Sequence, residues 1–275
     1  MINQELIKNL LQIKNSIRLT KPLIHCITNP ISINDCANVV LAVGGKPIMA
    51  EHPLEVAEIT SVSKSLGVNL GNITDVRMES MIISGRTALE KKIPQVIDLV
   101  GVACSALRLE YAKKFISECH PNVIKGNMSE IKAICGMNSN SKGIDVGKED
   151  IITEDNFNDT ITILKNFSKK IGAVIAVTGV IDIITDGVYT YFIENGCEML
   201  SMITGTGCMV NSLIATYIST GEILEGTVLA VALMGICGEL SQNAKGTGSF
   251  RTELIDNIFN ISDEVIIKKI KYKNF

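Results

Sequence analysis

Short apolar stretches alternate with helix-like segments along most of the chain, and this alternation restricts the possible folds more than any other feature of the sequence. Strands are expected at residues 22–27, 47–50, 66–70, 95–100, 122–125 and 173–177. Helical patterns are found at residues 1–17, 33–43, 53–65, 75–91, 108–118, 129–135 and 154–171. Strands that alternate with helices imply right-handed βαβ units and a mostly parallel central sheet. Residues 173–177 are apolar throughout, so helices are expected on both faces of this sheet.

The segment that follows the last of these strands predicts a different kind of pairing. Residues 181–185, 188–193 and a stretch near Glu198 are separated by the turn sequences Asp186-Gly187 and Asn195-Gly196, which favour antiparallel hairpins at a sheet edge. The chain after Cys208 is expected to be mainly helical, with a break at residues 245–248, and residues 138–150 are expected to form a loop. Nothing resembles a linker, so residues 1–275 are interpreted as one α/β domain.

Composition narrows the possible partners. A net charge of −3 and a pI near 5.7 give no general attraction to nucleic acid or to an anionic membrane, so neither partner is expected. The eight cysteines include no C-x-x-C pair, which argues against a structural zinc site. No secretory signal is expected at the start of the chain, and the longest apolar run, residues 227–237, is too short to span a bilayer. We therefore expect a cytoplasmic protein with reduced thiols.

The stretch Thr204-Gly205-Thr206-Gly207-Cys208 stands directly before a predicted helix. Two glycines among three residues let the backbone turn tightly and approach a ligand closely. The amide groups of such a turn and the positive end of the helix dipole make an anion site, in which the field favours a thiolate at Cys208. The alternative is a tight turn before a core helix, with Cys208 as a small buried apolar residue.

Polar residues at the ends of the predicted strands are the candidates for chemistry, because ligands of open α/β sheets bind beyond the carboxyl ends of the strands. They are Asn29, Asn69, Asn72, Asp98, Lys125, Asn127, Thr178 and Asp182. Position alone leaves several roles open. Asp98 is either a metal or phosphate partner or a helix cap, Lys125 either a phosphate ligand or a surface lysine, and Glu130 suits the first turn of a helix without any ligand.

Several phosphate and hydrolase motifs are absent from the sequence. It contains no G-x-x-x-x-G-K-[ST], no G-x-G-x-x-G after the first strand, no G-x-S-x-G and no H-E-x-x-H. What remains is an anion site late in the chain and carboxylates at earlier strand ends. This layout suits phosphoryl transfer, which depends mainly on positioning, Mg²⁺ and charge stabilisation.

Taken together in their order, the motifs of this chain resemble those of the hydroxyethylthiazole kinase family. They are P-L-I-H-C-I-T-N at 22–29, K-P-I-M-A at 46–50, K-G-N-M-S-E-I at 125–131, V-T-G at 177–179 with Asp182 and T-D-G at 185–187, T-G-T-G-C at 204–208, and K-G-T-G-S-F at 245–250. The match extends from about residue 20 to 255 without large gaps.

The resemblance implies a ribokinase-like fold and the ATP- and Mg²⁺-dependent phosphorylation of the primary alcohol of 4-methyl-5-(2-hydroxyethyl)thiazole, a step in thiamine biosynthesis and salvage. It also implies a homotrimer whose thiazole site lies at the boundary between subunits. The implied roles are thiazole binding by Asn29, Met49 and Gly205, ATP binding by Lys125 and Thr178, metal and phosphate contacts by Asp98 and Glu130, and an anion hole formed by Gly205, Thr206, Gly207 and Cys208.

Cys208 occupies the position at which related sugar and vitamin kinases carry an aspartate base. A thiol titrates near ~8.5 and a carboxylate near ~4, so the two groups are not equivalent bases at neutral pH. Our hypothesis is that Cys208 is catalytic, orients the substrate hydroxyl and takes its proton late, because a dissociative transition state needs little early proton abstraction.

The chain also departs from the pattern of the family. Where the family has D-P-V-G-A-G-A-T, this chain has D-L-V-G-V-A-C-S at residues 98–105. Lys125 replaces the arginine that the family carries before Gly-Asn, and Val180 replaces its acidic residue after Thr-Gly. The altered loop after Asp98 keeps open the alternative of a catalytically weakened paralogue that binds a thiazole or a nucleotide. A separate alternative within the same fold is a kinase for another small alcohol, of pyrimidine or pyridoxine type.

Overall fold

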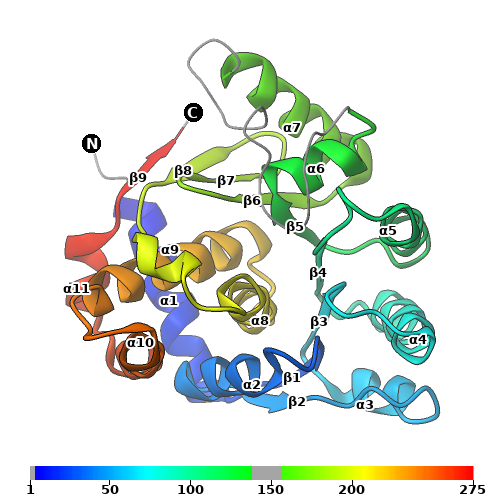
Figure 1. Cartoon of the computed structure of the whole chain (residues 1–275), viewed down its shortest axis with the longest axis horizontal. Coiled ribbons are helices and arrows are strands. Elements are labelled where there is room, and N and C mark those ends of the chain that lie inside the picture. Colours follow the sequence, from blue (N-terminus) through cyan, green and yellow to red (C-terminus); the bar gives the residue numbers. More distant parts are fainter. Residues whose placement is uncertain (1–3, 138–156, 275) are drawn as a thin grey trace.

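A nine-stranded sheet forms the centre of the protein, with the strand order β2-β1-β3-β4-β5-β6-β7-β8-β9 (Figure 1). The computed structural model describes residues 4–137 and 157–274, and all counts refer to these. Strands β1 to β6 are parallel, and β7, β8 and β9 are antiparallel to their neighbours. The strands are β1 Leu23–Ile27, β2 Lys46–Ile48, β3 Ser65–Asn69, β4 Gln95–Asp98, β5 Val123–Asn127, β6 Val174–Thr178, β7 Asp182–Thr185, β8 Thr190–Ile193 and β9 Tyr272–Asn274.

Helices cover both faces of the sheet, which confirms the predicted fold class (Figure 1). One face carries α3 Val56–Val62, α4 Asp75–Lys91, α5 Ala106–Cys119, α6 Met128–Ile134 and α7 Phe157–Ile171. The other carries α1 Gln4–Thr20, α2 Ile33–Ala42, α8 Thr206–Ile218, α9 Ile223–Ser241, α10 Thr247–Asn260 and α11 Asp263–Lys269. Successive residues of β4 illustrate the division, because Val96 packs into one hydrophobic cluster and Ile97 into the other.

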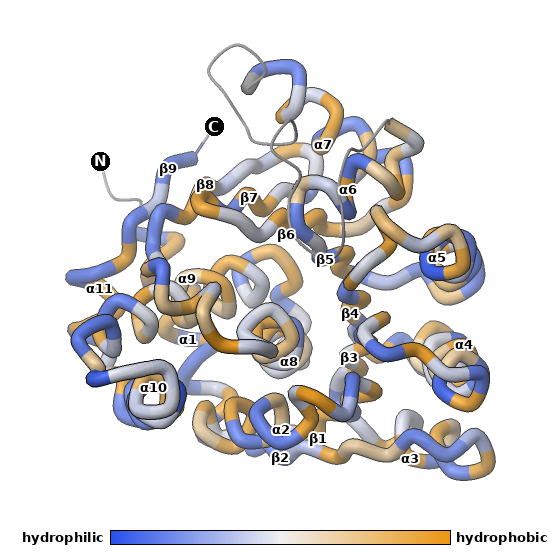
Figure 2. The backbone as a smooth tube through the Cα atoms, in the orientation of Figure 1, coloured by the Kyte–Doolittle hydropathy of each residue, from blue (hydrophilic) through white to orange (hydrophobic). Residues whose placement is uncertain are grey.

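Helices α8 and α9 form the centre of one layer and pack against each other and the sheet. In contrast, the outer helices α4 and α5 show hydrophobic and hydrophilic colours around each coil, as amphipathic helices do (Figure 2). Helix α9 is 19 residues long and apolar enough to cross a membrane. It is therefore longer than the apolar run at residues 227–237 of the sequence. However, 78% of its most apolar window is buried inside the protein, as expected of a core helix.

The expected strand near Glu198 is wrong, because residues Glu198–Ser201 form a 3-10 helix. The edge beside β8 is instead occupied by β9, close to the C-terminus of the described chain. The Asn195 side chain holds the segment that leads into β9, since its Oδ1 accepts a hydrogen bond from the Lys271 amide at 2.7 Å and its Nδ2 donates to the Lys269 carbonyl at 2.8 Å. The chain then turns onto α9, where Leu200 packs against Gly238.

The remaining boundaries differ from the predictions by a few residues. Helix α3 spans Val56–Val62 rather than 53–65, because strand β3 already begins at Ser65. Helix α1 continues to Thr20, past its predicted end at residue 17. The predicted loop at 138–150 and the predicted start of the following helix at 154 lie outside the described residues.

Candidate functional site

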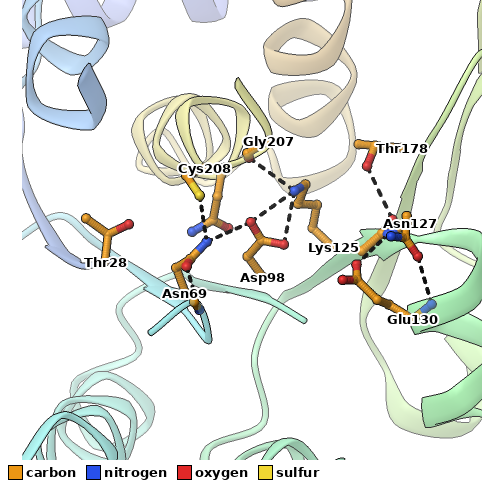
Figure 3. Close-up of polar contacts among 12 residues, drawn as sticks. Thr28, Asn69, Asp98, Lys125, Asn127, Glu130, Thr178, Gly207 and Cys208 are labelled. Carbon is orange, nitrogen blue, oxygen red and sulfur yellow. Dashed lines mark hydrogen bonds and ion pairs between the residues drawn. The ribbon is translucent and has the colours of Figure 1, made fainter. Parts of the chain in front are cut away.

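Polar side chains line the edge of the sheet at which the parallel strands end. Asn29 follows β1, Asn69 ends β3, Asp98 ends β4, Asn127 ends β5 and Thr178 ends β6. The register of the strands places Asn69 beside Asp98 and Asn127 beside Thr178. The first turn of α8 lies over the middle of this row, close to Asp98 (Figure 3). The sequence-predicted candidates of five strands therefore share one edge.

Asp98 and Lys125 form a buried ion pair at the centre of the site. Lys125 Nζ lies 3.0 Å from both carboxylate oxygens of Asp98, and it donates a third hydrogen bond to the Gly207 carbonyl at 3.1 Å. Both side chains are almost completely buried. Burial raises the pKa of Asp98, and the Lys125 ammonium and the Asn69 amide oppose that rise. Burial lowers the pKa of Lys125, but nearby Asp98 outweighs it and holds the pKa above its usual range.

The first turn of α8 presents the predicted glycine-rich segment to this ion pair. Gly205 stands at the N-cap with a φ of +91°, and a side chain there would collide with Ser32, because an added Cβ would lie 2.8 Å from the Ser32 Cβ. An added Cβ on Gly207 would lie 3.2 Å from Lys125 Nζ. Among the described residues, no side chain caps this helix start. Its amide groups and the helix dipole therefore favour an anion at this position.

Cys208 points from α8 toward the ends of β1 and β3. Its sulfur accepts hydrogen bonds from Asn29 Nδ2 at 3.1 Å and from Asn69 Nδ2 at 3.4 Å. Burial raises the pKa of the Cys208 thiol, the negative charge of Asp98 raises it further, and contacts with Ser32, Lys125 and Asn29 oppose the rise. The pKa of Cys208 therefore lies above its usual range, which favours the thiol over the thiolate expected from the helix dipole.

Glu130 links the loop after β4 to the start of α6. Its Oε1 accepts a hydrogen bond from the Gly101 amide at 2.8 Å, and its Oε2 accepts one from the Asn127 amide at 2.7 Å. Asn127 Oδ1 in turn accepts from the Glu130 amide, which completes a capping box. Burial and the charge of Asp98 raise the pKa of Glu130 to about 7. The structural role that the sequence left open for Glu130 is thus confirmed, and its metal role stays a prediction.

Of the remaining predicted residues, Met49 and Thr178 lie on the two flanks of the row, and Thr206 begins α8. Met49 follows β2 and packs, half-buried, against the cluster that contains α8. Thr178 lies at the opposite flank, where its hydroxyl is 3.5 Å from the Gly126 carbonyl. Thr206 donates its hydroxyl hydrogen bond away from the centre, to the Leu200 carbonyl at 2.9 Å.

Sequence reasoning missed one residue and left another without a role. Ser32 was not singled out, although it contacts both Gly205 and Cys208. Asn69 was noted only as a strand end, yet it contacts Asp98 and Cys208. The position of Asn69 directly after an apolar strand was the available signal, whereas no sequence pattern marks Ser32.

The mostly parallel sheet covered by helices on both faces, with the start of α8 at the carboxyl ends of its strands, is a ribokinase-like fold. A ribokinase-like superfamily protein from Enterococcus faecalis V583 shares this fold, with a TM-score of 0.58 at 11% identity over 86% of both chains. The match is much closer to the hydroxyethylthiazole kinase protein of Pyrococcus horikoshii OT3, with a TM-score of 0.87 and 30% identity, covering 98% of this chain and 99% of that one.

Sequence comparison identifies the family. The model of the hydroxyethylthiazole kinase family matches residues 14–264. A protein named hydroxyethylthiazole kinase 2, from Clostridium botulinum strain Hall, is 74% identical over 265 residues, which cover 96% of this chain and all of that protein. The chain therefore belongs to the hydroxyethylthiazole kinase family. It is an alcohol phosphotransferase of thiamine biosynthesis, with ATP as the co-substrate.

Proposed function

We propose that this chain transfers the γ-phosphoryl group of ATP to the primary alcohol of 4-methyl-5-(2-hydroxyethyl)thiazole at the cluster formed by Asp98, Lys125 and Cys208. The observation that carries the proposal is the order of the strands along the sheet. The implied thiazole ligands Asn29 and Met49 follow β1 and β2. The implied ATP ligands lie on β5 and β6, and β3 and β4 with the start of α8 stand between these flanks.

The spacing of these flanks suits two substrates that meet at the centre. Neighbouring strands lie about 4.8 Å apart, so the five steps from β2 to β6 span roughly 24 Å. A thiazole alcohol on the β1–β2 flank and a nucleotide on the β5–β6 flank would therefore bring their reacting ends together near Asp98. Phosphoryl transfer needs such positioning more than it needs covalent chemistry from the protein.

Mg²⁺ fits the carboxylates of this site in the manner usual for phosphate-transferring enzymes. Such sites hold Mg²⁺ by one or two carboxylates together with substrate phosphates. Asp98 and Glu130 would supply these carboxylates, and the described residues contain no group of three or more metal-binding side chains that could act as a cage. The raised pKa of Glu130 supports this assignment, because it reflects a buried carboxylate that a cation would stabilise. When bound, Mg²⁺ would neutralise charge on the phosphates.

The residues at the centre of the site have separate roles in the transfer of the phosphoryl group. The amides of Gly205, Thr206, Gly207 and Cys208 would receive the oxygens of the transferring group, at the positive end of α8. Lys125 is already held at this point by Asp98 and the Gly207 carbonyl, and its ammonium would attract the phosphates of ATP. The bond between the alcohol oxygen and the γ-phosphorus forms as the bond to the β–γ bridging oxygen breaks, and ADP leaves.

Cys208 would position the alcohol rather than act as its base. A thiol already holds its proton, and its raised pKa keeps it protonated at neutral pH. Its sulfur accepts from Asn29 and Asn69, which leaves its S–H for the Ser32 hydroxyl or for the alcohol oxygen of a bound substrate. The hydroxyl proton then passes to an oxygen of the transferred phosphoryl group, which a dissociative transition state permits because the proton is lost late.

We further propose a homotrimer in which the β1–β2 flank contributes to the contact between subunits. Large apolar side chains are exposed on this flank, with Ile31 63% and Leu54 90% accessible. A neighbouring subunit would cover them and complete the thiazole site. A cytoplasmic location is a second part of the proposal, supported by the eight free thiols.

An ADP-release assay tests the proposed reaction. The thiazole alcohol, pyridoxine and hydroxymethylpyrimidine are supplied in parallel with ATP and Mg²⁺, and ADP and the phosphorylated product are measured. We expect turnover with the thiazole alcohol and at least ~100-fold less with the others, because a mismatched pocket loses a few kcal/mol. Preferred turnover of either other alcohol, or thiazole binding without ADP release, would contradict the proposal.

A further inference from the structure

The side chain of Asn69 connects the two halves of the reaction centre. It ends β3 and is completely buried. Its Nδ2 donates to Asp98 Oδ2 at 2.8 Å and to Cys208 Sγ at 3.4 Å. Its Oδ1 accepts from the Gly71 amide at 2.8 Å and from Asn29 Nδ2 at 3.2 Å. These four contacts use the full hydrogen-bonding capacity of an amide side chain.

The orientation of this amide is fixed by a backbone group. The Gly71 amide can only donate, so the atom that faces it must be Oδ1 of Asn69. The Nδ2 group must then face Asp98 and Cys208 (Figure 3). Space around this contact is also restricted, since an added Cβ on Gly71 would lie 2.8 Å from both Asn29 Nδ2 and Asn69 Oδ1.

Asn29 is fixed in the same way on the other side of the sulfur. Its Oδ1 accepts from the backbone amides of Ile31 and Ser32, at 3.1 and 3.2 Å, so its Nδ2 faces Cys208. Two amide N–H groups therefore point at one sulfur atom. Neither amide offers the S–H of Cys208 an acceptor, so the S–H faces away from both, and the Ser32 hydroxyl is a further hydrogen-bond partner of this thiol. Because Asn69 uses its other N–H on Asp98, it also sets the distance between the thiol and the Asp98–Lys125 pair.

We propose that Asn69 is a positioning residue that holds the Cys208 sulfur and the Asp98 carboxylate in register for phosphoryl transfer. This inference rests on the proposed role of Cys208 and extends it to a residue that the motif comparison left without a function. Asn69 does not touch either substrate in this account. It acts through Cys208 and Asp98, so its loss should slow the transfer step and leave the binding of ATP and of the alcohol largely intact.

A double-mutant cycle with Cys208 tests the inference. Asn69→Leu keeps the branched shape of the side chain and removes all four hydrogen bonds, and Cys208→Ala removes the sulfur. The kinase activity of the full-length protein is measured for the native chain, both single variants and the double variant. Asn69→Leu should lower kcat by ~10- to 100-fold, the range for hydrogen bonds to charged or reacting groups, with each KM changed less than about threefold. In the Cys208→Ala background, the same substitution should lower kcat less than about fivefold.

Unfolding temperatures and circular dichroism establish that each variant is folded. If Asn69→Leu does not fold, Asn69→Ser is used, which keeps one hydroxyl donor but cannot span Asp98 and Cys208. An equal loss of kcat in both backgrounds, or a loss seen only as raised KM, would overturn the inference. The proposed role of Cys208 is judged separately, because it fails only if Cys208→Ala by itself retains full turnover.

Discussion

Replacement of Lys125 by Met provides a demanding test of the buried ion pair. The substitution keeps an unbranched side chain, one atom shorter, but removes the ammonium that lies 3.0 Å from both oxygens of Asp98. Asp98 is then left completely buried, with the Asn69 amide at 2.8 Å as its remaining side-chain partner among the described residues. Removal of one partner of a buried pair costs about 3–5 kcal/mol, because the other charge stays desolvated. For a chain of this length, that loss lowers the unfolding temperature by roughly 6–20 °C.

The assay is urea and thermal unfolding at pH 7.5, followed by circular dichroism. Lys113→Met is the matched control, since Lys113 forms an equally simple pair with Glu110 at 2.8 Å but both side chains are about half exposed or more. An exposed pair of this kind contributes about 0–1 kcal/mol. Addition of Asp98→Asn to Lys125→Met removes the unpaired charge, so the double variant should recover part of the lost free energy of unfolding. The reasoning is refuted if Lys125→Met is no more destabilising than Lys113→Met.

The pH dependence of the Lys125→Met variant gives an independent check with a definite sign. Burial already raises the pKa of Asp98, and loss of the ammonium removes the main force that opposes the rise. A carboxyl group whose folded pKa lies above its unfolded value stabilises the fold at low pH and loses that contribution as the pH rises through the folded pKa. The stability deficit of Lys125→Met should therefore shrink as the pH is lowered from 7.5 to 5.

Two further predictions concern the fold around the site. Gly205→Ala should lower the free energy of unfolding by about 1–3 kcal/mol in urea, because Gly205 has a φ of +91° and no room for a Cβ beside Ser32; an unchanged midpoint would contradict this. The pKa of buried His25 is lowered by burial, so its contribution to stability is present above pH 6.5 and is lost as the pH falls. Native stability should therefore fall more steeply from pH 6.5 to 5 than that of His25→Gln, and parallel curves would exclude this role.

The parallel part of the fold was predictable because its signals are local. Residues 66–70 were expected as a strand and β3 spans Ser65–Asn69, since an uninterrupted buried segment is visible in the sequence itself. Strand β9 was not predictable in this way. It is short, half-exposed or exposed, and it pairs with β8, while Lys271 just before it donates its amide hydrogen to the Asn195 side chain, 76 residues earlier in the chain. A local pattern at 195–201 could not reveal that this edge was already occupied.

Some contacts of the site could likewise be predicted from the sequence, and others could not. That Asp98 and Lys125 meet follows from their paired positions on the adjacent parallel strands β4 and β5, both of which a sequence reading can predict. The contact of Lys125 with the Gly207 carbonyl depends on where α8 packs, 82 residues later. The pKa of Cys208 could not be predicted from the sequence for a related reason. The helix dipole is local and favours a thiolate, but burial and the charge of Asp98 come from the assembled fold and outweigh it.

The central claim is that the alcohol binds over β1 and β2, ATP binds over β5 and β6, and the two meet at the start of α8. The most direct test measures KM for both substrates in two variants, Met49→Ala on the β1–β2 flank and Thr178→Ala on the β5–β6 flank. The account predicts that Met49→Ala raises KM for the thiazole alcohol by ~5- to 30-fold, from about 1–2 kcal/mol of lost contact, and leaves KM for ATP within about twofold. Thr178→Ala should raise KM for ATP and leave that for the alcohol unchanged. A rise in KM for ATP in Met49→Ala, or for the alcohol in Thr178→Ala, would contradict the account.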